Sequence, residues 1–441
     1  MSVLIVGAGP SGARLAIQLA RAGAEVTLVD RLADPHRHAY SSGALPLEAV
    51  RRLGLPDDAI AATWQGWQLH DPSGLVHQWW SSGDLGVVLD FGRLRSWLWE
   101  EARRHGVELI QGCRAVLSTL TADQASVRLQ TRDGRSSLRS TRWLIDATGA
   151  RRDLLLQAGL TPNPEDPLLQ GIGVEWLLQA DDRQAAAWRD RISFFLGTDW
   201  IPHGYGWIFP MQGQRLKVGV CHLPPADRPS PGSLAGPLQR LIQRCGLSAC
   251  PVLDRHGGPV SSSIARSEPL VAGALLAVGD AASSANLLGG EGIRHAMDSA
   301  DRLAELLIAE GMSGDSTAIA LLYQEQIKAQ RSWRWLVSGR LARRTWWGLD
   351  NPRADRRLER LIHGLSATAE APLSQSCCST TTSSVTACVC CRICSEPRFF
   401  SGRRLAPPSR DVLQSTPRAA RPWMAPMPMM WPRLVVPSRA A

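Results

Sequence analysis

Lysine is nearly missing from this sequence, since only Lys217 and Lys328 occur among 441 residues, of which 49 are basic. The other basic residues are Arg, and nine of them lie after residue 370 beside one Asp and one Glu, so most of the formal net charge of +9 falls in that segment. Neither an aromatic-rich binding module nor a recognition motif accompanies this charge. We therefore expect a nearly neutral folded part and no nucleic-acid partner.

Long apolar runs and paired cysteines are also missing. No run reaches the roughly 20 apolar residues that a membrane-spanning helix requires. The first residues lack the basic segment of a secretion signal. These absences predict a cytoplasmic protein, with peripheral contact with a membrane as an open alternative. The few cysteines before residue 371 lack the spacing of a disulfide scaffold, and they are Cys113, Cys221, Cys245 and Cys250.

The chain opens with the pattern of a strand, a glycine turn, a helix and a second strand. Residues 3–6 are apolar and mostly β-branched, residues 13–22 have helical periodicity, and residues 25–30 predict the next strand. A parallel pair of strands joined by a helix is the opening unit of a dinucleotide-binding fold. The sequence therefore predicts an α/β fold with a Rossmann-type parallel sheet.

The glycine turn between the first strand and the helix carries a G-x-G-x-x-G fingerprint made by Gly7, Gly9 and Gly12. Gly7 allows the tight turn, Gly9 lets the backbone approach a pyrophosphate, and Gly12 allows close helix packing. Asp30 ends the second strand, where a carboxylate accepts a hydrogen bond from a ribose hydroxyl, and this disfavours a 2′-phosphate. Arg31, directly after it, leaves a role toward a phosphate open.

A second motif distinguishes FAD from a nicotinamide dinucleotide. A predicted strand at residues 275–278 ends in Gly279-Asp280, and a glycine loop from Gly289 to Ile293 opens a helix. Asp280 can bind the ribityl hydroxyls of a flavin. The N–H groups of Gly290, Gly292 and Ile293 can point at the flavin N1 and C2 carbonyl and stabilise its anionic reduced form. The two motifs together predict a noncovalently bound FAD.

These motifs, with Asp146-Ala147-Thr148-Gly149, resemble the geranylgeranyl reductase family of FAD-dependent oxidoreductases over about residues 1–365. Between them, residues 205–210 (YGWIFP) resemble the family's Tyr-x-Trp-x-Phe-Pro signature, which implies a prenyl cavity lined by Tyr205 and Trp207. The resemblance also implies a fold like that of p-hydroxybenzoate hydroxylase. Cys221 and Phe91 depart from the family pattern. Phe91 stands where the family often has an Arg before the helix near the flavin, and Arg93 and Arg95 are the candidates to replace it.

We expect antiparallel strands, from the alternation around residues 68–80, 171–178, 192–196, 205–210 and 216–222, to form a substrate domain inserted into the FAD-binding domain. Helical patterns dominate from about residue 316 to 365, with Trp and Arg mixed on both faces. The expected division is an FAD-binding domain at 1–60, 90–165 and 266–312, a substrate domain at 61–89 and 166–265, a helical cap at 313–370 and a disordered or aberrant tail at 371–441.

The resemblance implies that reduced flavin delivers a hydride to a C=C bond of a polyprenyl substrate, a small molecule or a lipid. NADPH or another donor would bind only transiently, because no second glycine fingerprint is visible. By chemistry alone, His203 and Tyr205 are candidates for the proton donor. Two alternatives stay open: a flavin monooxygenase of a small aromatic or isoprenoid, and a non-catalytic FAD-binding protein. We expect no metal site, and the oligomeric state is not predicted.

Overall fold

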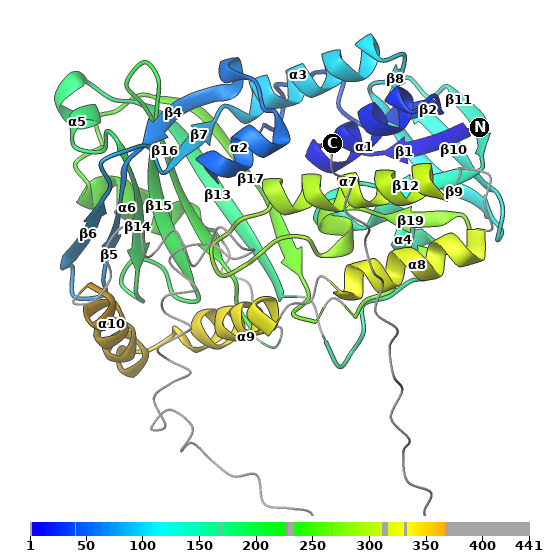
Figure 1. Ribbon diagram of the computed structural model, residues 1–441. Coiled ribbons are helices and arrows are strands. Elements are labelled where there is room, and N and C mark those ends of the chain that lie inside the picture. The colour runs from blue at the N-terminus through cyan, green and yellow to red at the C-terminus, as the bar shows by residue number, and fades with distance from the viewer. Residues whose placement is uncertain are drawn as a thin grey trace, which may run out of the picture. The chain divides into compact units, whose positions relative to one another are not determined.

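The computed structural model describes residues 2–39, 41–166, 169–225, 227, 233–265, 267–310, 316–329 and 333–366 (Figure 1). The tail expected at 371–441 lies outside the described residues. Of the expected elements, the opening strand and helix are confirmed, although the helix begins at Pro10 rather than Ala13. Proline suits the first helical position because its fixed φ is helical and its missing N–H would have no partner there.

A six-stranded sheet contains the glycine fingerprint, with the order β18-β19-β12-β1-β2-β8. All neighbouring strands are parallel except β18 and β19. Its central strands are almost wholly buried, as in parallel sheets that helices cover on both faces. The strands are β1 (Ser2–Val6), β2 (Glu25–Val29), β8 (Glu108–Ile110), β12 (Trp143–Asp146), β18 (Val271–Ala272) and β19 (Leu275–Ala277).

Three helices pack with this sheet: α1 (Pro10–Arg21), α3 (Phe91–Arg104) and α7 (Ile293–Ala309). Helix α1 contacts both α3 and α7. The indole nitrogen of Trp99 on α3 donates a hydrogen bond to the Ala8 carbonyl at 2.8 Å, so α3 also holds the glycine turn in place.

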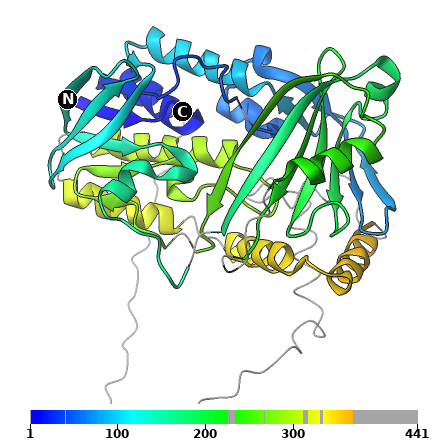
Figure 2. The same ribbon diagram turned by 180° about the vertical axis from the view of Figure 1, so that it is seen from behind.

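A seven-stranded sheet, ordered β17-β13-β16-β15-β14-β5-β6, forms the second layer (Figure 2). It is antiparallel except for the pair β14 and β5. One face packs on α6 (Ala235–Arg244) through residues such as Ile208 and Val218, while Tyr205, Trp207 and Phe209 belong to a different core on the other face. The strands are β5 (Gly66–His70), β6 (Val76–Trp80), β13 (Leu169–Gln179), β14 (Arg191–Leu196), β15 (Gly204–Met211), β16 (Arg215–His222) and β17 (Val252–Ser262). This mixture of a parallel and an antiparallel sheet confirms the predicted fold class.

Two smaller three-stranded sheets were not predicted. One is the meander β9 (Cys113–Leu120), β10 (Ala125–Thr131) and β11 (Ser136–Thr141). The other joins β3 (Ala44–Pro46), β7 (Gly86–Leu89) and β4 (Ile60–Trp64). Short helices occur at α2 (Leu47–Leu53), α4 (Asp153–Gln157) and α5 (Asp182–Ala186), with 3-10 turns at η1 (Asp57–Ala59), η2 (Gly149–Arg151) and η3 (Gly279–Ala282).

The last described helices are α8 (Ser316–Ala329), α9 (Trp333–Gly348) and α10 (Pro352–Ser366). The hydroxyl of Tyr323 on α8 donates a hydrogen bond to the Ala277 carbonyl at 2.7 Å, which fixes α8 beside the parallel sheet. In both views α9 and α10 lie at the lower end of the seven-stranded sheet (Figures 1 and 2). Within the described ranges, no helix combines the length and the apolar character needed to cross a bilayer.

Candidate active site

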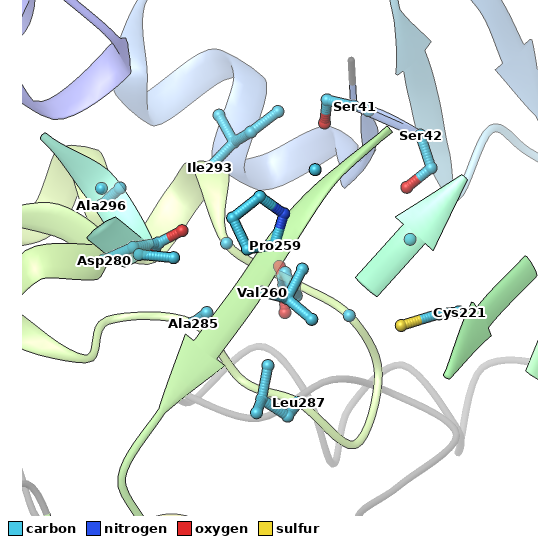
Figure 3. A pocket seen from close by; sticks show the side chains of 18 of the residues that line it. Ser41, Ser42, Cys221, Pro259, Val260, Asp280, Ala285, Leu287, Ile293 and Ala296 are labelled. Carbon is cyan, nitrogen blue, oxygen red and sulfur yellow. The ribbon is translucent and has the colours of Figure 1, made fainter. Parts of the chain in front are cut away.

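A cavity of about 760 Å³ is lined by residues of both large sheets and of helices α9 and α10. One part contains the glycine fingerprint, Asp30 and the Asp280 motif. The other part is walled by apolar side chains from the seven-stranded sheet and from the C-terminal helices. Figure 3 shows side chains around this space that come from distant parts of the chain: Ser41, Ser42, Cys221, Pro259, Val260, Asp280 and Ile293.

Each of the three fingerprint positions requires glycine for a different physical reason. Gly7 has a φ of 107°, and a Cβ atom there would stand 2.2 Å from the Ala147 carbonyl oxygen. A Cβ atom on Gly12 would stand 1.9 Å from the Gly7 carbonyl oxygen. At Gly9, in contrast, a Cβ atom would meet no described protein atom within 4 Å. Gly9 lines the cavity just before α1 begins, so the open space lies where a helix N-terminus favours a pyrophosphate.

Asp30 fixes the turn at the nucleotide end of the cavity. Its two carboxylate oxygens accept backbone N–H bonds from Ala8 at 2.7 Å and from Leu32 at 2.8 Å. Each carboxylate oxygen has two lone pairs, so capacity is left for a ribose hydroxyl. Arg31 is exposed at the rim of the same cavity.

The flavin motif, at η3 and the loop before α7, lines a further part of the cavity. Asp280 is part of η3, accepts a hydrogen bond from the Ser284 hydroxyl at 3.0 Å and lines the cavity. Burial raises the pKa of its carboxyl. Gly289, Gly290, Gly292 and Ile293 line the cavity as well, and Ile293 is the first residue of α7. FAD requires three features that this cavity provides. They are the open space at Gly9, the remaining acceptor capacity of Asp30 and the N-terminus of α7 at Ile293.

The glycine loop before α7 is stabilised from inside and from α9. Glu291 forms a buried ion pair with Arg294 at 2.7 Å, and although burial opposes the charged form, His295 and Arg294 lower the pKa of Glu291 to about 2. The indole nitrogen of Trp346 on α9 donates to the Leu287 carbonyl at 3.0 Å. The centroids of the Trp346 and Tyr205 rings also lie 5.1 Å apart. Sequence reasoning missed this role of α9, although its Trp-rich pattern was a signal.

Tyr205 and Trp207 line the cavity beside Gly290, whereas His203 is not among the lining residues. The His203 ring shares a hydrogen bond of 3.0 Å with the Trp346 carbonyl, and its backbone N–H donates to the Leu349 carbonyl at 2.7 Å. His203 therefore connects β15 to the end of α9. Burial raises the pKa of the Tyr205 hydroxyl, so this group keeps its proton at neutral pH.

Near the position of Phe91, the sequence offered Arg93 and Arg95 as replacements for a missing Arg. Arg95 lines the cavity and donates to the Pro35 carbonyl at 2.6 Å, so it fixes the segment after β2. Arg93 is half exposed and pairs with Asp90.

Three ionisable residues at the cavity were not predicted: Glu175 and His256 line it, and Lys217 is buried beside the lining residue Ser41. Glu175 on β13 accepts a hydrogen bond from the Trp207 indole nitrogen at 2.7 Å. The Lys217 ammonium on β16 donates to the carbonyls of Ser41 at 2.6 Å and Leu89 at 2.9 Å, and Ser41 lines the cavity. One signal was available, because Lys217 is one of only two lysines and stands within an apolar strand.

Comparison with known proteins agrees with this geometry. Residues 1–336 match the family model described as FAD binding domain. The chain is 29% identical over 360 residues to a digeranylgeranylglycerophospholipid reductase of Methanothrix thermoacetophila, covering 77% of this chain and 85% of the relative. It is 29% identical over 355 residues to a menaquinone reductase of Mycolicibacterium smegmatis, covering 73% and 80%.

The fold is similar to the crystal structure of a geranylgeranyl bacteriochlorophyll reductase-like protein from Thermoplasma acidophilum. The TM-score is 0.73 at 20% identity, with 84% of this chain and 92% of that chain covered. The resemblance to geranylgeranyl reductases that the motifs indicated is thus confirmed by relatives along most of the chain. This chain belongs to the FAD-binding domain family, and it is an FAD-dependent oxidoreductase.

Proposed function

We propose that this oxidoreductase reduces C=C bonds of a polyprenyl substrate of the geranylgeranyl type, with bound, reduced FAD supplying the hydride. The observation that carries the proposal is the cavity, which continues from the Asp280 motif to a wall of Tyr205, Trp207 and Phe209. Aromatic and aliphatic walls favour an apolar chain over a small charged substrate. The names of the two reductase relatives support the same class of substrate.

Each site residue has a proposed task. Gly7, Gly9 and Gly12 with Asp30 and Arg31 hold the adenosine diphosphate part of FAD, and Asp280 with Gly289, Gly290, Gly292 and Ile293 holds the flavin part. Tyr205 and Trp207 orient the prenyl chain and exclude water. His203 holds Trp346 in position, since its ring is hydrogen-bonded to the backbone carbonyl of that residue.

A transient electron donor, NADPH or another small reductant, completes the proposed cycle. The sequence has one glycine fingerprint of the G-x-G-x-x-G type in a βαβ unit, and Gly7, Gly9, Pro10 and Ser11 of that unit line the FAD part of the cavity. A nicotinamide cofactor would therefore bind from outside and leave after reduction.

The proposed division of labour follows the two large sheets. The segments 1–60, 90–165 and 266–312 form the FAD-binding domain, and 61–89 with 166–265 form the substrate domain. This is supported by the seven-stranded sheet, which draws β5 and β6 from the first inserted segment and β13 to β17 from the second. Residues 313–370 form a helical cap, whose α9 and α10 line the apolar part of the cavity.

We further propose a cytoplasmic location with peripheral contact with the membrane through this cap. The inner faces of α9 and α10 line the cavity through Leu341, Trp346 and Ile362. The exposed residues of the two helices include several Arg: Arg340, Arg344, Arg353, Arg356, Arg357 and Arg360. Anionic lipid headgroups attract a basic surface by about 1 kcal/mol for each Arg near the bilayer.

The test is reoxidation of chemically reduced protein without oxygen. A geranylgeranyl compound should reoxidise the flavin with saturation of one or more C=C bonds, followed by stopped-flow absorbance and mass spectrometry of the product. A monooxygenase would stay reduced until oxygen is added and would then incorporate it into a phenol. A protein that stays reduced in both experiments would support the non-catalytic alternative.

A further inference from the structure

The face of the seven-stranded sheet that lines the cavity carries a row of residues of which the proposed FAD and prenyl contacts use only Trp207. His256 on β17 pairs with Glu175 on β13, Glu175 pairs with Gly219 on β16, and Gly219 pairs with Trp207 on β15. Residues in register on neighbouring strands share a face of the sheet. A Cβ atom on Gly219 would stand 2.2 Å from the Trp207 ring, so the indole crosses that strand to reach Glu175.

Hydrogen bonds run along this row from solvent to the cavity. The side chain of Asp254 is 60% exposed and shares a hydrogen bond of 2.9 Å with His256 Nδ1. His256 Nε2 lies 2.9 Å from Glu175 Oε1, and the other Glu175 oxygen accepts from the Trp207 indole. Glu175 and His256 have side chains 4% and 8% exposed, and both line the cavity. The imidazole therefore links an exposed carboxylate to a buried one.

We propose that the Glu175–His256 pair supplies the proton of the reaction and that Asp254 positions His256 to take up the next proton from solvent. The proposal rests on the proposed function, in which one carbon of the C=C bond gains a hydride. The other carbon gains a proton from the pair, delivered by the Glu175 carboxyl. His256 Nε2 gives its proton to the carboxylate, the imidazole keeps its Nδ1 proton beside Asp254, and the free Nε2 then takes up the next proton from solvent water.

Several charged groups face this pair and set its charge state. The positive charge of Lys217 on β16 lowers the pKa of Glu175. The negative charge of Asp90, before α3, raises the pKa of Lys217. Burial favours neutral Glu175, yet Lys217, His256 and the Trp207 indole lower its pKa. Burial likewise opposes His256 charging, but Glu175 and Asp254 raise its pKa above the ordinary 6.5. The pair therefore keeps the proton on His256 to a higher pH than an ordinary imidazole would, and loses it as the pH rises further.

The experiment combines an NMR titration with single turnovers. In the oxidised holoprotein, the His256 imidazole signal, assigned by its loss in His256→Gln, should titrate above 6.5 and move down toward 6.5 in Glu175→Gln. Glu175→Gln keeps an oxygen for the Trp207 indole, so the cavity wall is retained. In anaerobic turnover with a geranylgeranyl compound, Glu175→Gln should slow reoxidation by about 10² to 10⁴-fold with FAD content unchanged. The wild-type rate should fall at alkaline pH, and this limb should vanish in His256→Gln.

The matched control is His105→Gln, because His105 also lies beside a carboxylate, that of Glu101 at 3.6 Å, but outside the residues that line the cavity. It should leave both readouts unchanged. A His256 that titrates at its ordinary value, unaltered by Glu175→Gln, overturns the relay whatever the reaction is. If the titration is as expected but no prenyl compound reoxidises the wild type, the proposed function fails and the relay fails with it as a proton supply. An unchanged rate in Glu175→Gln, with the wild type active, overturns the relay alone.

Discussion

The hydroxyl group of Tyr205 lies so close to Gly290 that a Cβ atom at position 290 would stand 2.2 Å from its oxygen. This contact joins the seven-stranded sheet directly to the glycine loop before α7. Gly290 also has a φ of 67°, a conformation that side chains rarely adopt. The aromatic wall of the cavity and the glycine loop before α7 are therefore in direct contact.

Gly290→Ala should weaken FAD binding at least tenfold, because the methyl group meets the Tyr205 hydroxyl and the residue is strained by about 1 to 3 kcal/mol. FAD affinity is measured by titrating apoprotein and following flavin fluorescence. The double variant Gly290→Ala with Tyr205→Phe removes the blocking oxygen and should recover part of the loss. Equal affinity of wild type and Gly290→Ala would show that this loop does not contact the cofactor.

A second prediction separates two glycines of the fingerprint. Gly9→Val should leave a folded protein without FAD, because the side chain enters space that is open in the protein and that the pyrophosphate would fill. Gly12→Val should lower the thermal stability even of apoprotein, because its side chain meets the Gly7 carbonyl. Unfolding midpoints of both apoproteins, and the FAD content of both preparations, check this. Full FAD occupancy in Gly9→Val would contradict the assignment of this turn.

Local motifs could be predicted from sequence, but contacts across strands could not. Gly7, Gly12 and Asp280 lie within short spacings whose strand and helix context is visible in the sequence, so the parallel sheet and the two FAD motifs followed. Glu175 and His256 meet only through the register of β13 and β17, and 81 positions separate them. Such a register depends on the whole sheet.

The meander of β9, β10 and β11 was missed for a different reason. Five of the six residues of β11 are exposed, and the sixth, the buried Thr141, is polar, so this edge strand has little of the apolar alternation that reveals strands. Its hydrogen bonds to β10 form without an apolar face of its own. The position of His203 was likewise not predictable, because its contact with Trp346 spans 143 positions.

A third prediction concerns acid stability. Because the Glu291 pKa falls from 4.5 to about 2 on folding, its ion pair stabilises the protein fully above pH 4.5 and loses this effect as the pH falls toward 2. Arg294→Met removes the nearer of the two basic partners of the buried Glu291 carboxylate, the other being His295 at 3.7 Å, and should destabilise by about 3 kcal/mol at pH 7. The difference from wild type should shrink at pH 3, as measured by thermal unfolding.

The control for this prediction is Arg52→Met. Arg52 on α2 forms an ion pair at 2.6 Å with Asp298, which lies on α7 as Arg294 does. The Arg52 side chain, however, is 48% exposed. Such exposed pairs contribute about 1 kcal/mol or less. If both variants lose the same stability at pH 7, burial of the Glu291 pair has no special role.

The last prediction tests the basic surface of α10. Replacing Arg353, Arg356 and Arg357 by Gln should weaken binding to vesicles that contain anionic phospholipid at least tenfold, because each Arg near the surface contributes about 1 kcal/mol. Added salt should weaken wild-type binding in the same way, since exposed charges are screened. Arg135→Gln with Arg139→Gln, on the exposed face of the β9–β11 meander, removes charge elsewhere and should have little effect. Cosedimentation with anionic and with neutral vesicles measures both. Equal binding to the two kinds of vesicle, or equal losses in the two sets of variants, would show that α10 is not the surface that meets the membrane.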